Sequence, residues 1–244
     1  MTRHHLGLQG AAVLATRHLL LTGQAVADVI DSEAMGAIVG PAGLGKTFAI
    51  ADARESRSEP VVALSFEARP TMRLVADRLL HALTGAPGTG TRFAMTAQLL
   101  DRLAERRRLV VIGEAQNLTR DCFEYLRHLH DDPATRFALI FDGGDGAWEV
   151  LAREPMLRSR IYRRVAFTAL SDSDVLALIP AYHPIYTGID AELLLLINDK
   201  AANGRMRSWA AFTHTAAKIC GKIATERIDP AIARSTIAQL GAAG

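Results

Sequence analysis

The 244-residue chain has little cysteine, no long apolar run and a net charge of only +2. Its two cysteines, Cys122 and Cys220, lie far apart in helical patterns, so the sequence suggests neither a disulfide framework nor a zinc site. No apolar stretch reaches the roughly 18 residues that a membrane helix needs. The first residues lead into an amphipathic segment rather than a signal sequence. We therefore expect a globular, cytoplasmic protein with no membrane partner.

The low net charge conceals two groups of arginines, at Arg106–Arg108 and between Arg153 and Arg164. Such groups permit an anionic partner without requiring one, because solvated faces of ordinary proteins carry the same pattern. The sequence also lacks an obvious acceptor-substrate motif, which argues against a simple metabolic kinase.

The strongest chemical signal is Gly40-Pro41-Ala42-Gly43-Leu44-Gly45-Lys46-Thr47, which matches G-x-x-x-x-G-K-[ST]. A short apolar segment before it predicts a strand, and the residues from Thr47 to Ala51 predict a helix. Glycines let the backbone aim N–H groups at phosphate, and the helix N-terminus attracts the same anion. We expect this loop and the adjoining Phe48 to bind ATP, with Lys46 on the β- and γ-phosphates and Thr47 on Mg²⁺. The alternative is a glycine-rich turn that matches by chance.

A second motif is the apolar run Leu109–Gly113, which predicts a buried strand and is followed by Glu114. A carboxylate there can polarise the water that attacks the γ-phosphate, although an ordinary strand-end carboxylate remains the alternative. Gly113 occupies the position where a metal-side aspartate is expected. Either Asp142 or Asp145, after the next apolar segment, could replace it, unless both serve only the turn. A slow or inactive ATPase is equally consistent with Gly113.

The rest of the chain supplies further elements and candidate residues. We expect a helix from about Leu8 to Thr22, a helical stretch from Ala25 to Ile30, and helices near 171–180, 190–199, 204–220 and 229–240, with caps at Ser171 and Asp229. Alternating strands and helices between them predict a parallel sheet. The expected parts are a lead-in (1–35), a nucleotide-binding core (36–169) and a helical lid (170–244).

These motifs, with Ser159-Arg160-Ile161 and Gly204-x-x-Arg207 in the same order, resemble the AAA+ ATPases of DNA transposition, such as the phage Mu B protein, TniB and TnsC. The resemblance spans about residues 16–220. It implies a P-loop NTPase fold, with a five-stranded parallel sheet flanked by helices and followed by a small all-helical lid. It also implies an ATP- and Mg²⁺-dependent protein that assembles as a ring or filament on double-stranded DNA without reading its sequence. Such proteins deliver target DNA to a transposase.

Carried over residue by residue, the resemblance makes Glu114 the catalytic base, Arg160 or Arg158 an arginine acting on a neighbouring subunit, and Arg207 a lid sensor. The position of the polar sensor falls near Asp142 or Gly143, and Asp142 remains a candidate metal-side carboxylate. Arg205, like Arg207, could contact phosphate from the lid, although all these arginines could be ordinary surface residues. Charge alone makes Arg106, Arg107, Arg108, Arg120 and Arg127 candidates for DNA contact.

Two other functions remain open on the sequence. A signalling or defence-type ATPase would use the helical lid to bind a protein and would show no salt-dependent affinity for DNA. An assembly switch without useful hydrolysis would bind ATP and release no phosphate, and Gly113 favours that possibility.

Overall fold

The computed structural model describes residues 5–241. The chain forms two compact units. The sheet unit contains Leu21–Pro41 and Asp52–Ala166, and the helical unit contains the chain up to Leu20, Ala42–Ala51 and the chain from Phe167 onward. Within residues 5–241, no helix is both long and apolar enough to cross a membrane.

The sheet unit is built on five parallel strands in the order β2-β3-β4-β1-β5. The strands are β1 (Met35–Val39), β2 (Val61–Ser65), β3 (Arg108–Gly113), β4 (Phe137–Gly143) and β5 (Ile161–Ala166). The three central strands, β3, β4 and β1, are buried almost throughout, as their continuous apolar sequences predict for a sheet covered on both faces. The predicted five-stranded parallel sheet is confirmed, and β4 lies between β1 and β3.

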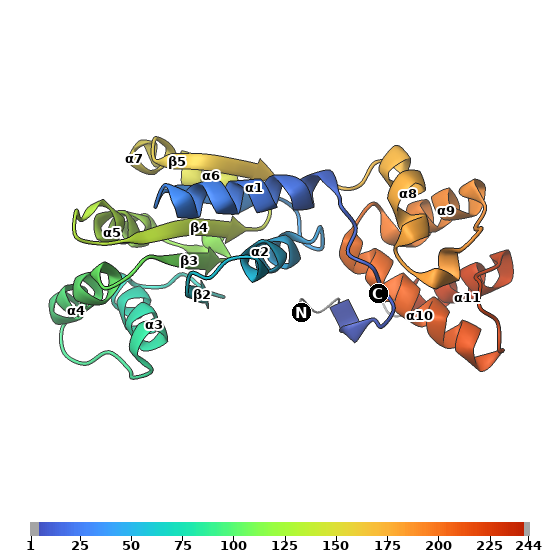
Figure 1. Ribbon diagram of the computed structural model, residues 1–244, viewed down its shortest axis with the longest axis horizontal. Helices are drawn as coiled ribbons and strands as arrows, with labels where there is room; N and C mark the ends of the chain where they lie inside the picture. The colour runs from blue at the N-terminus through green and yellow to red at the C-terminus, as the bar shows by residue number, and fades with distance from the viewer. Residues whose placement is uncertain (1–4, 242–244) are drawn as a thin grey trace. The chain divides into compact units, whose positions relative to one another are not determined.

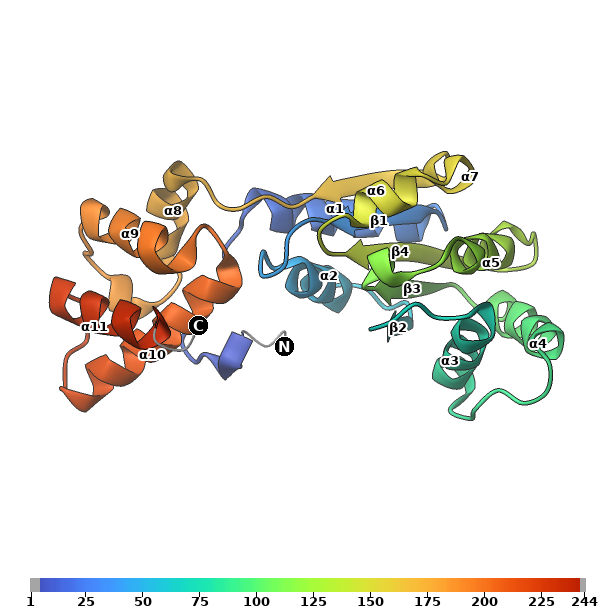
Figure 2. The same cartoon turned by 180° about the vertical axis from the view of Figure 1, so that it is seen from behind.

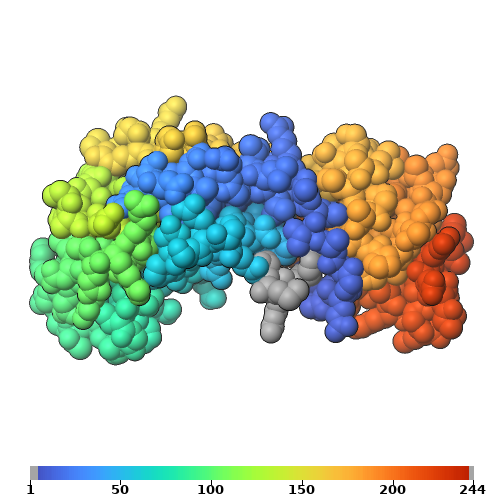
Figure 3. Space-filling model, viewed as in Figure 1, coloured from blue at the N-terminus to red at the C-terminus, as the bar shows by residue number. Residues whose placement is uncertain are grey.

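Helices cover both faces of this sheet (Figures 1 and 2). One face packs against α3 (Met72–Thr84), α4 (Arg92–Ala104), α5 (Arg120–Asp131), α6 (Ala147–Ala152) and α7 (Pro155–Arg158) in a single apolar core. On the other face lies α1 (Arg17–Asp31), whose blue atoms form part of the surface seen in Figure 3. The contact is close, because a Cβ added at Gly36 would lie 3.0 Å from Cγ2 of Val29.

Threonine caps set the starts of three of these helices. The side chains of Thr71, Thr91 and Thr119 each accept a hydrogen bond from the backbone N–H three residues later, at the N-termini of α3, α4 and α5. A capping hydroxyl satisfies a backbone donor that the helix itself leaves unpaired. These caps fix the first residues of α3, α4 and α5 at Met72, Arg92 and Arg120.

The helical unit contains α8 (Asp172–Leu178), α9 (Ala191–Ile197), α10 (Met206–Lys222) and α11 (Pro230–Gly241) around an apolar core of their own. The first residues of α2 (Lys46–Glu55) also belong to it. Both predicted caps are confirmed. Ser171 forms a capping box with Asp174, and Asp229 Oδ1 accepts from the Ile232 N–H at 2.8 Å.

The helix expected from about Leu8 to Thr22 is wrong in its first half. α1 begins only at Arg17, where Thr16 Oγ1 accepts the Leu19 N–H at 3.1 Å, and it then continues unbroken to Asp31. The two helical stretches predicted there are therefore one helix with a later start.

Residues 8–14 instead form a strap on the helical unit. Gly10 has a φ of +77° and interrupts helical geometry, and the Ala12 N–H donates to the carbonyl of Tyr182 at 2.8 Å. Leu8 and Leu14 are buried in the core of the C-terminal helices. The amphipathic pattern read from the sequence thus reflects burial of an irregular segment rather than a helix face.

Candidate nucleotide-binding site

The phosphate loop leaves the sheet at the carboxyl end of β1. The Gly40 N–H donates to the carbonyl of Gly143, the last residue of β4, at 3.2 Å. Further along the loop, Gly43 and Gly45 have φ angles of +83° and +99°, which L-residues with a Cβ rarely adopt. α2 then begins at Lys46, with the Ala49 N–H bonded to the Gly45 carbonyl at 2.9 Å. The loop thus has the strand, turn and helix context that its sequence predicted.

In the helical unit, the first turn of α10 rests against this loop. The Arg207 N–H donates to the carbonyl of Gly43 at 2.9 Å. A Cβ added at Gly43 would lie 3.4 Å from Cβ of Arg207, and one at Gly45 would lie 4.0 Å from Cβ of Met206. The structure therefore brings Arg207 to the phosphate loop through its backbone, while its side chain and that of Arg205 are exposed.

Glycine also fixes the turn that precedes α10. Gly204 has a φ of +67°, and a Cβ there would lie 2.5 Å from the carbonyl oxygen of Leu170. The Gly204 carbonyl in turn accepts the Leu170 N–H at 2.9 Å. This pairing ties the start of α10 to the segment that enters the helical unit after β5.

In the sheet unit, Glu114 lies immediately after β3 in a strained backbone conformation. Its φ and ψ are 54° and 42°, the left-handed region, although it is not a glycine. Such residues cost on the order of 1–3 kcal/mol and are concentrated at functional sites. The Gln116 side-chain amide donates to the Glu114 carboxylate, which is otherwise exposed.

Two amides after Glu114 connect the ends of three strands. Gln116 Oε1 accepts the N–H of Gly144, just past β4, at 2.9 Å. Asn117 Nδ2 donates to the carbonyl of Phe66, just past β2, at 2.7 Å. Sequence reasoning assigned neither amide a structural role, although two amides directly after a strand-end carboxylate are a signal that could have been read. They hold the Glu114 turn against both neighbouring strands.

Asp142 and Asp145, the two candidates to replace the carboxylate missing at Gly113, occupy different environments. Asp142 lies within β4, opposite Ile38 of β1, and its side chain is 9% exposed. Asp145 lies in the turn after β4 and is exposed. Only Asp142 is therefore held by the sheet.

The two candidate trans-acting arginines also differ. Arg160 Nε forms an ion pair with Asp131 at 2.7 Å, and Asp131 is also paired with Arg127 at 2.7 Å. Partial burial opposes ionisation, but the bonds from Arg160 and Arg127 hold the pKa of Asp131 below its usual value. Arg158 ends α7 and is exposed, and within residues 5–241 its side chain forms no hydrogen bond or ion pair.

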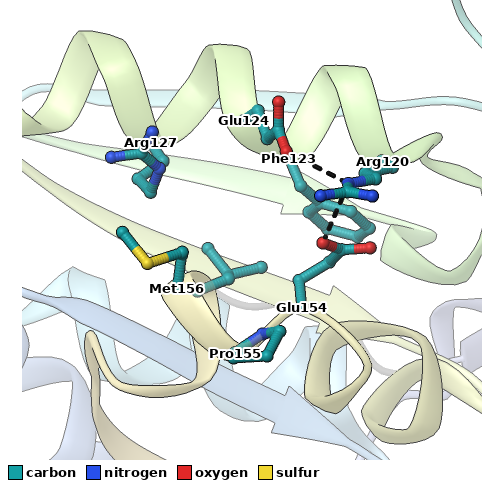
Figure 4. Close-up of a pocket in the computed structure, with 8 residues that line it drawn as sticks. Arg120, Phe123, Glu124, Arg127, Glu154, Pro155 and Met156 are labelled. Atoms are coloured by element: carbon teal, nitrogen blue, oxygen red, sulfur yellow. Dashed lines mark hydrogen bonds and ion pairs between the residues drawn. The ribbon is translucent and has the colours of Figure 1, made fainter.

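A groove of about 280 Å³ lies beside these arginines, between α5 and α7. Phe123, Pro155, Met156 and Leu157 give it apolar walls, and Arg120 spans one end through ion pairs to Glu124 at 3.1 Å and Glu154 at 3.3 Å (Figure 4). Met156 at its rim is 57% exposed. The groove contains none of the residues expected to bind nucleotide.

Most of the arginines proposed for DNA contact on their charge form ion pairs within the chain or are buried. Arg107 pairs with Glu33, Arg120 with two glutamates and Arg127 with Asp131. Arg108 is buried at 4% exposure and donates to backbone carbonyls, so its nomination was wrong. Only Arg106 has no side-chain partner within residues 5–241.

The strain at Glu114 predicts an inverted order of stability between two variants. Glu114→Gly and Glu114→Ala both remove the carboxylate and its bond to Gln116, and they differ only in Cβ. We expect Glu114→Gly to be the more stable by about 1 kcal/mol, because glycine adopts the left-handed region without a steric penalty. Urea unfolding without nucleotide, followed by circular dichroism, measures the difference. A more stable Glu114→Ala, the order usual at other positions, would contradict the strain.

Solved structures that share this fold include the following three. Cdc6p from Pyrobaculum aerophilum matches with a TM-score of 0.74 and 19% identity, over 95% of this chain and 69% of that chain. The Aeropyrum pernix ORC1 protein in complex with DNA matches with a TM-score of 0.65 and 18% identity, over 94% and 66%. The Thermotoga maritima RuvB Holliday junction branch migration motor matches with a TM-score of 0.63 and 14% identity, over 93% and 70%. At these identities the likeness concerns the fold.

A search of curated protein sequences finds no match. The sequence profile of the AAA domain matches residues 29–151, just over half of the chain. That segment contains the phosphate loop, β1 to β4 and Glu114. The chain therefore belongs to the AAA domain family.

Proposed function

We propose that the chain is an ATPase that assembles on double-stranded DNA in its ATP state and delivers that DNA to a transposase. The observation that carries the proposal is the seating of α10 on the phosphate loop, through the Arg207 N–H and the Gly43 carbonyl. A phosphate bound in the loop would press on the same glycine backbone. Binding or loss of nucleotide would thereby change the contact between the phosphate loop and α10.

In this proposal, different residues of the chain bind the phosphates of ATP and activate the attacking water. Lys46 and the loop N–H groups bind the phosphates, and the exposed Arg207 side chain reads the γ-phosphate from α10. Glu114 accepts the proton of the attacking water, and Gln116 holds its carboxylate in place. The available donors are oxygens, the Thr47 hydroxyl and strand-end carboxylates, and therefore fit Mg²⁺, which prefers oxygen ligands. Mg²⁺ held there would neutralise charge on the phosphate oxygens.

A second surface supports an anionic polymer as the partner. Phe93, at the start of α4, is 74% exposed, and the Arg92 guanidinium lies 4.4 Å from the centre of its ring. Arg73 Nη1 donates to the carbonyl of Gly90 at 2.6 Å and so lies on the loop that leads to Phe93. Exposed apolar side chains such as phenylalanine can insert between the base steps of a duplex, and arginines bind phosphate. Arg73, Arg92 and Phe93, here called the α4 tip, would contact DNA.

The comparisons support DNA as the partner more than they support transposition. The ORC1 protein that shares this fold was solved in complex with DNA. Transposition is supported by the order of the sequence motifs, from the phosphate loop through Glu114-Ala115-Gln116 to Gly204-x-x-Arg207.

A protein-directed ATPase is the second candidate, and the groove between α5 and α7 favours it. Its apolar walls and the exposed Met156 suit a short segment of a partner protein. In that case ATP would change the affinity for the partner protein, and plain DNA would not bind.

Binding to plain duplex DNA tests the proposal. We expect fluorescence anisotropy to show binding with ATP and much weaker binding with ADP or without nucleotide. Because phosphate contacts release counterions, the affinity should fall steeply with salt. The absence of binding in every nucleotide state would contradict the proposal and favour the protein-directed ATPase.

Matched variants locate the DNA contact in the same assay. Phe93→Ala should weaken binding to duplex DNA, because the apolar side chain that inserts between base steps is lost, and Phe93→Leu should retain most of the affinity. Met156→Ala removes another exposed apolar side chain, on α7, and should leave DNA affinity unchanged. Equal effects of Phe93→Ala and Met156→Ala would rule out the α4 tip.

We further propose that Arg158, rather than Arg160, acts on the nucleotide of a neighbouring subunit. Arg158 is exposed and unpaired within residues 5–241, whereas Arg160 is held by Asp131 and by the carbonyl of Met156 at 3.1 Å. Arg160 thus anchors the end of α7 against α5 and positions Arg158. Guanidinium at that place would stabilise charge developing on the transferred phosphoryl group.

A mixing experiment tests this assignment. Arg158→Ala should lower ATP hydrolysis by roughly 10³-fold, the usual contribution of such an arginine. Lys46→Ala should also be inactive, but its own Arg158 is intact. Mixing the two variants should therefore restore phosphate release, because Arg158 of one subunit completes the intact site of another. If Arg158→Ala alone is as active as the wild type, the assignment is wrong.

A further inference from the structure

The missing carboxylate at Gly113 leaves a place in the sheet that could hold one. Gly113 has no positive φ that would demand glycine. A Cβ added there would meet Ser65 Oγ at 3.4 Å, and the Leu64 carbonyl oxygen and Ser65 Cβ at 3.5 Å, which are ordinary contact distances. The backbone therefore does not exclude aspartate at this position, and oxygen atoms line part of the space.

The sheet register places Asp142 beside that space. Ser65 of β2 pairs with Gly113 of β3, and Asp142 of β4 pairs with Ile38 of β1. Between β3 and β4 the last pair is Ile112 with Phe141, so Gly113 and Asp142 are the next positions along. Because neighbouring strands lie about 4.8 Å apart, the Asp142 backbone is one strand spacing from that of Gly113.

Gly113 and Asp142 also share a face of the sheet. Ile112 and Phe141 both belong to the core under α3 to α7. Since side chains alternate along a strand, the next residue of each strand faces the opposite side. That side is the one covered by α1, as the contact between Gly36 and Val29 shows. Asp142 therefore projects from the face from which an aspartate at position 113 would project.

We propose that Asp142 supplies the metal-side carboxylate that β3 lacks, displaced by one strand toward β1 and the phosphate loop. The inference rests on the proposed binding of ATP and names the residue whose carboxylate would orient the Mg²⁺ bound with it. Asp142 lies one residue before Gly143, whose carbonyl accepts the first N–H of the loop. Its carboxylate would orient the water shell of the ion, since Mg²⁺ keeps several waters and binds few carboxylates directly.

Asp145 does not fit this role. It lies beyond the end of β4, in a turn, and its side chain is exposed. Nothing in the strand register fixes it at the level of Gly113. Asp142 is instead held between β1 and β3 by the pairing of β4 with both strands. A charge fixed in this way can be aligned with an ion in the site, whereas a charge on a solvated turn is screened.

A metal-side carboxylate at Asp142 differs chemically from a residue that senses phosphate at the same position. A sensor contacts phosphate or water through a hydrogen bond, which asparagine supplies as well as aspartate. A metal-side carboxylate must carry negative charge, which asparagine lacks. The substitution Asp142→Asn therefore separates the two roles, and moving the carboxylate back to β3 tests whether the charge itself is what matters.

The experiment measures the affinity for a fluorescent ATP analogue in Mg²⁺ and in EDTA. We expect Mg²⁺ to tighten binding to the wild type, and Asp142→Asn to lose about 10- to 100-fold of that gain, as is usual for groups that orient metal ligands. Affinity in EDTA should stay unchanged. The double variant Gly113→Asp with Asp142→Asn should regain the Mg²⁺ effect. Asp145→Asn is the matched control and should behave as the wild type.

Three results would overturn the inference. These are a full Mg²⁺ effect in Asp142→Asn, no return of the Mg²⁺ effect in the double variant, and a loss of the Mg²⁺ effect in Asp145→Asn. If Asp142→Asn does not fold by circular dichroism, Asp142→Ser serves as the uncharged variant with the same expectation. A wild type that binds no analogue in either condition would instead refute the proposed ATP binding, and the inference with it.

Discussion

The pairing of β1 with β4 is the constraint on which the rest of the structure depends. It puts the start of the phosphate loop next to the end of β4, where the Gly40 N–H bonds to the Gly143 carbonyl. Glycine is required at 143, because a Cβ there would lie 2.3 Å from Cβ of Ala147 at the start of α6. The same pairing places Asp142 between the loop strand and β3. A register slip of one residue would turn Asp142 to the other face of the sheet.

At this edge of the sheet, the turn after β3 is held firmly by hydrogen bonds and yet contains a strained residue. The amides of Gln116 and Asn117 hold the turn after β3 to the strands on either side, while Glu114 within that turn keeps a costly left-handed backbone. Local strain persists only where surrounding bonds over-determine it. The hydrogen bonds of Gln116 and Asn117 therefore explain how Glu114 is held at the edge of the sheet in a backbone conformation that a non-glycine residue rarely adopts. In a similar way, the ion pair between Arg160 and Asp131 holds the end of α7 against α5.

The sequence predicted the parallel sheet and the phosphate loop, because buried strands and the glycine spacing are local patterns. It failed for residues 8–14, where Gly10 and the bond from Ala12 to Tyr182 decide the conformation, and that bond joins segments distant in sequence. It failed for Arg108, since charge in a sequence does not reveal burial. The proposal of Asp142 over Asp145 likewise rests on the strand register, which no local pattern contains.

The most direct test of the account is calorimetric titration of the wild type and of Lys46→Ala with ATP in Mg²⁺. The account predicts one site per chain in the wild type and little or no binding in Lys46→Ala, with both proteins equally folded by circular dichroism. The Lys46 ammonium is the main side-chain cation that the loop offers to the β- and γ-phosphates. Equal ATP affinity in the two proteins would contradict the account, because the phosphate loop would then not be the nucleotide site.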